Sequence, residues 1–380
     1  MAEGLHHFDP LRMRAVSKHL DAGYAPRSVV VPATSELRKP LRGRVWHDKA
    51  CRHQVRRGFS PRRVQFAATV AHRVENPLLA KEMFLFDAQR MYLDTSIELQ
   101  YLQLQALPAV TERFTEAITG SQGAPVDERF CDDTLLISHH EGGGTWGHYL
   151  VQSMPRMLLF LDTFASGKIA IPASYAEGAR GFGEALALYN IPPERLAPIE
   201  DATVYRLKQA ILLDFLFNFE TGSPHPKALG MLRNFQPRDP GAPAVKPAAF
   251  IRRKTDSLRA INNAADVEAV MSRHGVDVYG PETLSLTEQV ELWRGHDLVI
   301  ATLGSDLTNI VYARPGTSVL ALSPNWFGDS FFFELSVAAG VRWHELRCGQ
   351  MAERSPDVEH YSSFNVDVRL LDSILDGLLD

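Results

Sequence analysis

The sequence feature that most constrains the fold is residues 297–324, where two apolar runs flank a turn of small residues. The run at 298–301, LVIA, has no polar residue, which is typical of a parallel strand buried on both faces. A turn follows at 302–306, then an expected helix at 307–313 and a second strand at 318–322. This order predicts a βαβ unit. Its turn either receives an anion at the start of the helix or is only a tight connection.

The same alternation of strands and helices occurs twice, which predicts an α/β chain with parallel sheets covered by helices. Before residue 236 we expect strands at 134–138, 168–172 and within 205–213, and helices at 148–164, 178–189 and 226–234. Pro155 lies inside the first of these helices and predicts a kink. Beyond residue 248 we expect strands at 249–252, 276–279 and 341–346, and helices at 264–273, 286–293 and 330–339.

Proline and glycine punctuate residues 236–247, QPRDPGAPAVKP, which predicts a linker. We therefore divide the chain into an N-terminal domain, 1–235, and a C-terminal domain, 248–350, followed by a tail at 351–380. In the tail, Val366, Leu370, Ile374 and Leu378 recur at helical spacing, so an amphipathic helix is expected. Within the first domain, residues 1–130 are a peripheral part in which strands are predicted at 84–86 and 97–104.

Residues 38–63 are strongly basic in a chain whose formal net charge is -5. They contain ten lysines and arginines and one acid, Asp48, which gives a local charge of 10 − 1 = +9. Such a run is usually a solvated face. The alternative is a surface that contacts anionic lipid head groups or a phosphorylated acceptor.

Composition excludes several other classes of protein. The negative net charge argues against a general nucleic-acid binder, and no run approaches the roughly 20 apolar residues of a membrane helix. Cys51, Cys131 and Cys348 lie far apart without metal-ligand spacing, as expected in a reducing compartment. The first residues carry no apolar segment typical of a signal peptide. These features predict a cytoplasmic protein. The G-x-G-x-x-G fingerprint of a Rossmann oxidoreductase follows none of the expected strands.

Four segments of the chain resemble a known family of enzymes. Residues 146–156, WGHYLVQSMPR, are similar to the N-x-x-H-x-x-x-E/D-x-x-P-R helix of glycosyltransferase family 61. Residues 250–254 with 259–263, FIRRK and RAINN, resemble its Y-I-S-R and R-x-I-x-N-E segment. Residues 281–289, PETLSLTEQ, resemble its P-E-x-L-S-x-x-E-Q helix entry, and 300–309 with 315–317 resemble its G-x-H-G-A-G-L-T-N and P-G loop. The four occur in the family order.

The resemblance implies the GT-B fold, in which two doubly wound, Rossmann-like domains face a central cleft. It implies an inverting, metal-independent glycosyltransferase that needs no cofactor and uses a nucleotide-sugar as co-substrate. The donor would bind mainly to the C-terminal domain and a glycan or glycolipid acceptor to the N-terminal one. The expected reaction is hexosyl or pentosyl transfer to a cell-envelope or capsular glycan, in the cytoplasm or peripherally at the inner membrane.

The chain also departs from the family pattern at polar positions. Leu303 stands where the loop histidine is usual, Asp306 replaces a glycine, and Gln152 replaces a carboxylate. Ala264 and Ala321 likewise stand at acidic positions. The alternative interpretation is therefore a non-catalytic glycan or nucleotide-sugar binding protein with a degraded active site.

Donor binding requires cations or N–H groups at the departing phosphates. Arg253 and Arg259 are our candidates, because a guanidinium grips phosphate oxygens in a bidentate manner. Gly304, Ser305 and Thr308 are expected to help at the helix start, with Asn263 and Asn309 as further donor-binding residues. Asp306 would repel a phosphate, so we expect it to bind ribose or sugar hydroxyls or to cap the helix.

An inverting transfer also needs a base that takes the proton of the acceptor hydroxyl. His148 is the leading candidate, because it opens a helix after a glycine-rich loop and because histidine is the side chain most often used as a general base. Glu141 and His140 are the alternatives. The cluster at 139–141 would permit a metal, but consecutive residues seldom point at one ion, so no metal site is expected. Arg156 either fixes the kinked helix or contacts substrate.

Overall fold

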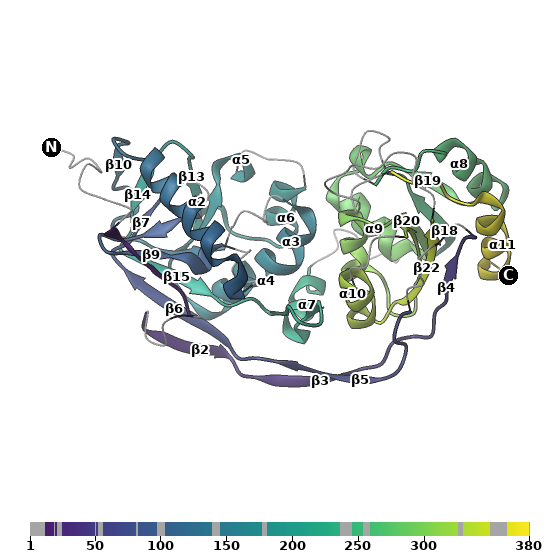
Figure 1. The fold of residues 1–380 in the computed structure, drawn as a ribbon, viewed down its shortest axis with the longest axis horizontal. Helices are drawn as coiled ribbons and strands as arrows, with labels where there is room; N and C mark the ends of the chain where they lie inside the picture. Colours follow the sequence, from purple (N-terminus) through teal and green to yellow (C-terminus); the bar gives the residue numbers. More distant parts are fainter. Residues whose placement is uncertain are drawn as a thin grey trace. The chain divides into compact units, whose positions relative to one another are not determined.

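The structure is a computed structural model of the 380-residue chain. It describes residues 12–18, 20, 25–49, 51, 56–80, 83–96, 103–138, 145–176, 181–235, 245–253, 259–325, 330–349 and 363–379. The described part is a mixed α/β structure, as the alternating pattern predicts (Figure 1). Contacts between residues divide the chain into two compact units. The first contains 1–34 and 66–219, and the second contains 35–65 and 220–380.

The first unit contains two six-stranded sheets. One has the order β13-β12-β11-β15-β6-β2, and the other has the order β1-β9-β8-β7-β14-β10. The strands of the first sheet are β2 (Arg27–Val31), β6 (Thr69–Glu75), β11 (Thr134–Ile137), β12 (Lys168–Pro172), β13 (Leu196–Ile199) and β15 (Gln209–Leu213). Those of the second are β1 (Arg14–Val16), β7 (Leu78–Leu79), β8 (Leu85–Phe86), β9 (Arg90–Tyr92), β10 (Val126–Asp127) and β14 (Val204–Arg206).

The first sheet is parallel in its β13-β12-β11-β15 portion, and β6 and β2 extend it antiparallel. One hydrophobic core joins the two sheets, since Leu85 and Tyr92 of one cluster with Leu135, Ile137 and Leu212 of the other. Strand β11 has β12, the next strand along the chain, on one side and β15, a later strand, on the other, so the strand order reverses at β11. This is a topological switch point, where ligands of α/β sheets bind at the carboxyl ends of the strands.

The helical elements of the first unit complete its layers. They are η4 (Leu93–Thr95), η5 (Gln103–Ala106), α2 (Leu107–Gly120), α3 (Trp146–His148), η7 (Tyr149–Ser153), α4 (Met154–Thr163), α5 (Ala173–Ala176), α6 (Phe182–Leu188) and η8 (Pro193–Arg195). Helix α2 buries Val110, Phe114 and Ile118 in a second core against β7, β8 and β9. Leu78, Phe86 and other strand residues form the opposite side of that core.

The second unit is built on one six-stranded sheet with the order β19-β18-β20-β21-β22-β4. All of its pairings are parallel. Its strands are β4 (Val45–His47), β18 (Lys246–Ile251), β19 (Asp277–Tyr279), β20 (His296–Thr302), β21 (Ser318–Pro324) and β22 (Arg342–Cys348). Apart from β4, the order along the chain is 2-1-3-4-5, a doubly wound arrangement. Its switch point lies between β18 and β20.

Helices cover the sheet of the second unit. They are α7 (Pro226–Arg233), α8 (Ala264–Arg273), η9 (Pro281–Thr283), α9 (Leu286–Gly295), η10 (Ser305–Tyr312), α10 (Phe331–Ala339) and α11 (Val368–Leu379). The capping box of Ser285 and Glu288 fixes the start of α9. Helix α11 lies beside α8 (Figure 1) and buries Leu371, Ile374 and Leu375 in the core. The amphipathic tail helix is thereby confirmed.

The two units do not follow the expected domain boundaries. Residues 35–65 join the second unit because β4 pairs with β22, so a purple strand lies beside a yellow one in Figure 1. Strands β3 (Thr34–Arg38) and β5 (Arg62–Phe66) form a two-stranded sheet from the two ends of this segment. The second unit also begins at Glu220, before α7, because Arg233 of α7 donates to the carbonyl oxygens of Val311 and Ala339. Two further short strands are β16 (Phe217–Asn218) and β17 (Ser223–Pro224).

Several local predictions need correction. Residues 103–106 form a 3-10 turn before α2, where a strand was predicted, and the rest of that predicted strand, 97–102, lies outside the described residues. The predicted strand within 205–213 is two strands, β14 and β15. The predicted α-helix at 307–313 is the 3-10 helix η10, which already begins at Ser305. Most of the predicted linker, 236–244, and the first part of the tail, 351–362, also lie outside the described residues.

Candidate functional site

Two segments meet at the switch point of the second unit, one after β18 and the other after β20. Arg253 lies two residues beyond the end of β18, and Gly304 lies two residues beyond the end of β20. The guanidinium of Arg253 lies so close to the Gly304 Cα that a Cβ at Gly304 would overlap it. Gly304 has an extended backbone (φ 171°), so the requirement for glycine comes from space and not from backbone conformation. The missing side chain at Gly304 therefore makes room for the cation.

Arg259 brings a second guanidinium to the same place. It has a positive φ of 60°, is 9% exposed, and donates from Nε to the carbonyl oxygen of Leu303 at 2.9 Å. Its Nη2 would lie 3.5 Å from a Cβ on Gly304. Two candidates chosen from sequence, Arg253 and Arg259, are thus brought together around a third, Gly304. The unusual backbone at Arg259 is a local strain that the surrounding bonds hold in place.

Asp306 lies beside this pair of arginines on the first turn of η10. Burial raises the pKa of its carboxyl, and the charge of Glu282 acts in the same direction. Arg253 and Arg259 oppose the shift through their positive charges. Burial lowers the pKa of Arg253, and Asp306 opposes that change. Burial thus disfavours the charged form of Asp306, and the positive charges of Arg253 and Arg259 partly offset that effect.

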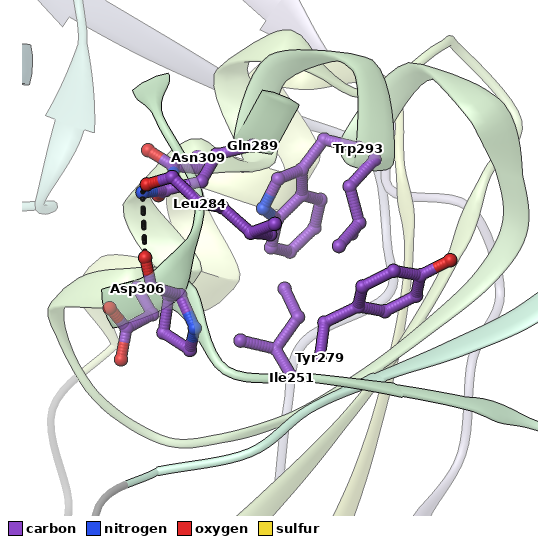
Figure 2. Close-up of a pocket in the computed structure, with 9 residues that line it drawn as sticks. Ile251, Tyr279, Leu284, Gln289, Trp293, Asp306 and Asn309 are labelled. Atoms are coloured by element: carbon purple, nitrogen blue, oxygen red, sulfur yellow. Dashed lines mark hydrogen bonds between the residues drawn. The ribbon is translucent and has the colours of Figure 1, made fainter. Parts of the chain in front are cut away.

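A pocket opens next to Asp306 at the same end of the sheet (Figure 2). It contains about 240 Å³ of space when its open mouth is counted. Its lining is mostly apolar and comes from β18, β19, η9, α9 and η10. The lining residues are Ile251, Tyr279, Pro281, Leu284, Gln289, Leu292, Trp293, Asp306 and Asn309. Figure 2 shows Asp306 on the opposite side of the pocket from the ring of Tyr279.

Asn309 is fixed in the wall of this pocket by Gln289. Its Nδ2 donates to Oε1 of Gln289 at 3.0 Å, and Nε2 of Gln289 donates to the carbonyl oxygens of Pro281 and Leu284. These bonds join α9, η9 and η10 around the opening. Asn309 is therefore placed at the pocket, as a donor-binding residue must be.

The other predicted donor-binding residues, Asn263, Ser305 and Thr308, do not line the pocket. Both polar atoms of the Asn263 side chain bond to the backbone of Val366, each at 2.9 Å, so this amide holds the C-terminal segment. Thr308 is fully buried, and its hydroxyl has no hydrogen-bond partner within the described part of the chain. Ser305 is the first residue of η10 and is partly exposed. A donor contact for these three residues stays a prediction.

The leading candidate for the base, His148, lies in the first unit. It ends the short helix α3, which follows β11, and its Nδ1 lies 3.0 Å from Oε1 of Gln152. Gln152 is buried, and the two residues share one helix face as their spacing predicts. Glu141, His139 and His140 lie outside the described residues.

The expected kink of this helix takes a definite form. Residues Tyr149–Ser153 form a π-helical turn, in which the N–H of Met154 donates to the carbonyl oxygen of Tyr149. Pro155 follows at once and has no N–H to continue the regular ladder. Wide turns of this kind inside α-helices are frequent at functional sites. Here the turn lies directly after the predicted base.

Arg156 has a structural position in the first unit. It is 4% exposed and donates to the carbonyl oxygens of Ser138, at the end of β11, and Gln152. Its guanidinium also lies 4.0 Å from the ring centre of Phe215, beyond the end of β15. Burial lowers the pKa of Arg156 to about 9, so it is still a cation at neutral pH. Of our two alternatives, the contacts favour fixing the helix against the sheet.

Nine of the ten basic residues of 38–63 are described and fall into two groups, and Arg52 lies outside the described residues. Arg38, Arg57 and Arg62 turn inward and pair with Glu36, Glu345 and Glu334. Six others are exposed: Lys39, Arg42, Arg44, Lys49, Arg56 and Arg63. Part of the basic run is thus explained by the folding of 35–65 onto the second unit. The exposed group leaves a basic surface.

Two further findings concern the whole described part of the chain. Within it, no three His, Cys, Asp or Glu side chains are grouped as a metal ion would require. No helix among the described residues is long and apolar enough to cross a membrane.

The comparisons with known proteins agree with the resemblance seen in the sequence. The fold and the site place the chain among α/β proteins that carry two arginines at the switch point of a parallel sheet. The family model for Glycosyltransferase 61 matches residues 146–320, from α3 to β21, which include His148 and the residues around Gly304. This match confirms the resemblance of these residues to glycosyltransferase family 61. No curated protein matches the chain.

Sequence reasoning missed the apolar half of the site. Tyr279, Leu284 and Trp293 occur in the sequence as ordinary strand and helix residues, and only folding brings them together at the pocket. Their positions in and next to the P-E-x-L-S-x-x-E-Q segment were the available signal, since Leu284 lies inside it and Trp293 four residues beyond its end.

Proposed function

We propose that this protein is an inverting, metal-independent glycosyltransferase that uses a nucleotide-sugar. The observation that carries the proposal is the gathering of Arg253 and Arg259 around Gly304 at the switch point of the second unit. Two guanidinium groups at this position suit a diphosphate leaving group, whose charge rises as the bond to the sugar breaks. The two units would form the GT-B arrangement, with the donor on the second and the acceptor on the first.

In the proposed reaction, His148 takes the proton from the acceptor hydroxyl. When Nδ1 of His148 carries the ring proton and donates to Gln152, Nε2 has the free electron pair that a base needs. The acceptor oxygen then bonds to the anomeric carbon from the face opposite the phosphate. The bond between that carbon and the phosphate oxygen breaks, and Arg253 and Arg259 stabilise the departing nucleoside diphosphate. Glu141 is the alternative base.

The proposal is tested by binding of nucleotides, three nucleoside diphosphates and one monophosphate. UDP, GDP, dTDP and CMP, with their sugar conjugates, are screened by thermal shift, where a ligand at 100 times its dissociation constant stabilises by about 2.7 kcal/mol. We expect at least one to bind, and Arg253→Ala to weaken it about 10- to 100-fold through the loss of a charge-assisted contact. Equal affinity of the variant would refute the placement of the phosphates, and no binding by any donor would refute the donor class.

A second candidate function is supported by the neutral amide at Gln152. A carboxylate there would stabilise a protonated histidine, and Gln152 cannot do so. A family member that binds a nucleotide-sugar or glycan without transferring it would tolerate this change. Donor binding with no transfer to any offered glycan, and no effect of His148→Ala, would favour this binding function.

We also propose that the exposed cations of 38–63 contact an anionic membrane at the cytoplasmic face, where a glycolipid acceptor would lie. Each basic residue near such a surface contributes about 1 kcal/mol. The test is flotation with vesicles of phosphatidylcholine alone or mixed with phosphatidylglycerol. We expect binding only to the mixture, with a clear loss in the variant Arg42→Ser and Arg44→Ser. Equal flotation with both vesicles would contradict this proposal.

A further inference from the structure

We infer that Asn263 is a positioning residue for the donor, which keeps Arg259 in place by joining the chain beside it to the C-terminal segment, 363–379. The inference rests on the proposed function, in which Arg259 binds the departing diphosphate. It gives the C-terminal segment a part in donor binding, although residues 363–379 do not line the pocket.

The first step is the backbone conformation of Arg259. Its φ of 60° lies in the left-handed region, which residues with a side chain seldom adopt. Such a conformation costs free energy and persists only where the surroundings hold it. In this conformation the side chain donates to the carbonyl oxygen of Leu303 and lies beside Gly304. The position of this guanidinium therefore depends on the contacts that fix the neighbouring backbone.

The second step is a set of four hydrogen bonds to the residues that follow this arginine, which we call the clamp. In the backbone, the N–H of Phe364 donates to the carbonyl oxygen of Ala260 at 3.0 Å, and the N–H of Asn262 donates to that of Phe364 at 2.9 Å. The side chain of Asn263 bonds to both the N–H and the carbonyl oxygen of Val366, each at 2.9 Å. The clamp thus fixes the chain within four residues of the arginine.

The third step is the unusual bonding of Asn263. It is the N-cap residue of α8, where an asparagine usually accepts a hydrogen bond from the first turn of its helix. Here the side chain makes no capping bond, and both of its polar atoms bond to a residue 103 positions later. An amide suits this contact, because one planar group carries both a donor and an acceptor. The bonds indicate that this side chain serves the clamp and not the start of the helix.

The fourth step is the support of the clamp on its other side. Phe364 is fully buried, and Val366 is 3% exposed. Helix α11 follows and packs beside α8 (Figure 1), with Leu371, Ile374 and Leu375 in the same core. The C-terminal segment is therefore held by the core of the second unit, and it can support residues 260–263.

The test is a double-mutant cycle of Asn263 and Arg259. The nucleotide that binds best in the screen is titrated by calorimetry into the wild type, the two alanine variants and the double variant. We expect Arg259→Ala to weaken binding about 10- to 150-fold, through the loss of a charge-assisted hydrogen bond. Asn263→Ala should weaken it about fivefold or more, but not beyond Arg259→Ala, because the arginine must regain its strained backbone in order to bind. The double variant should bind within about threefold of Arg259→Ala, since Asn263 acts through that side chain.

Two further variants separate this role from a general weakening of the fold. Asn263→Ser keeps a good N-cap residue for α8 but cannot make both bonds to Val366, so it should also weaken the nucleotide. Asp372→Ala is the matched control, because Asp372 bonds to Arg273 at 3.0 Å and to His274 at 2.9 Å, at the other end of α8. It removes contacts of α11 away from the clamp and should bind the nucleotide with wild-type affinity.

Each outcome decides the inference. If the nucleotide binds but the Asn263 variants bind it like the wild type, or their losses add fully to that of Arg259→Ala, the inference is refuted while the proposed function stands. An equal loss in Asp372→Ala would refute it as well, because the effect would then come from the docking of α11 as a whole. If the melting temperature shows that Asn263→Ala does not fold, the same cycle with Asn263→Ser decides. If no nucleotide binds the wild type, the proposed function fails and the inference fails with it.

Discussion

Gly304→Ala provides the sharpest test of the donor site, because it displaces the Arg253 side chain while Arg253 itself is not substituted. An added Cβ would overlap the Nη1 atom of Arg253 and lie 3.1 Å from its Cζ, so the guanidinium must move away. The backbone at Gly304 is extended and accepts alanine without strain. The substitution should therefore change the free energy of unfolding little and change donor binding much.

The magnitude follows from the contact that is lost. A hydrogen bond to a charged group contributes about 1.5–3 kcal/mol, and each 1.4 kcal/mol is a factor of about ten. We expect Gly304→Ala to weaken the nucleoside diphosphate about 10- to 150-fold in calorimetry, with a nearly unchanged melting temperature of the free protein. Gly58→Ala is the control, since a Cβ there meets nothing within 4 Å.

A double-mutant cycle shows whether the loss passes through Arg253. If Gly304→Ala acts by displacing that guanidinium, it should have little further effect once Arg253 is already alanine. Losses that add fully in the double variant would refute this reasoning, and so would a Gly304→Ala protein that binds with wild-type affinity.

Three further outcomes are expected. Asp306→Asn should melt at a higher temperature than the wild type at pH 7. Burial raises the pKa of the Asp306 carboxyl in the folded state, so the stability of the wild type falls as the pH rises and this carboxyl loses its proton. The difference in melting temperature should vanish near about pH 3.5, and a lower melting temperature of the variant at pH 7 would contradict the prediction. Gln152→Glu should move the acid limb of the transfer rate, measured against pH, to higher pH by about 1–2 units, because a carboxylate stabilises protonated His148; an unchanged limb would exclude His148 as the base. Arg156→Ala should lower the free energy of unfolding in urea by about 2–4 kcal/mol, because the carbonyl oxygens of Ser138 and Gln152 lose a buried donor, and a loss below about 0.5 kcal/mol would show that water replaces it.

Beyond residue 245, the sequence predicted the elements of the second unit well, because several of its strands contain a short apolar run and turns separate them. Residues 264–273 form the helix α8 at the predicted bounds, and 298–301 lie inside β20. Such runs carry their signal locally, so no knowledge of distant contacts is needed. The C-terminal helix was predictable for the same reason, since its apolar positions recur at one spacing.

The part that failed depends on contacts between distant segments. Strand β4 has three residues of intermediate burial, and it becomes a strand by pairing with β22, whose residues lie 345 − 45 = 300 positions later. Nothing in residues 45–47 indicates this partner. The division of the chain at 219–220 is equally non-local, because Arg233 bonds to the distant carbonyl oxygens of Val311, Ala313 and Ala339.

The candidate site shows the same division between local and distant information. Arg253 and Gly304 follow apolar strands, and chains of this class bind ligands there, so their positions could be predicted. From the sequence, Asp306 was expected to repel a phosphate, and therefore to bind ribose or sugar hydroxyls or to cap the helix. Its place beside an apolar pocket could not be predicted, because only folding brings Tyr279 and Trp293 to the same opening.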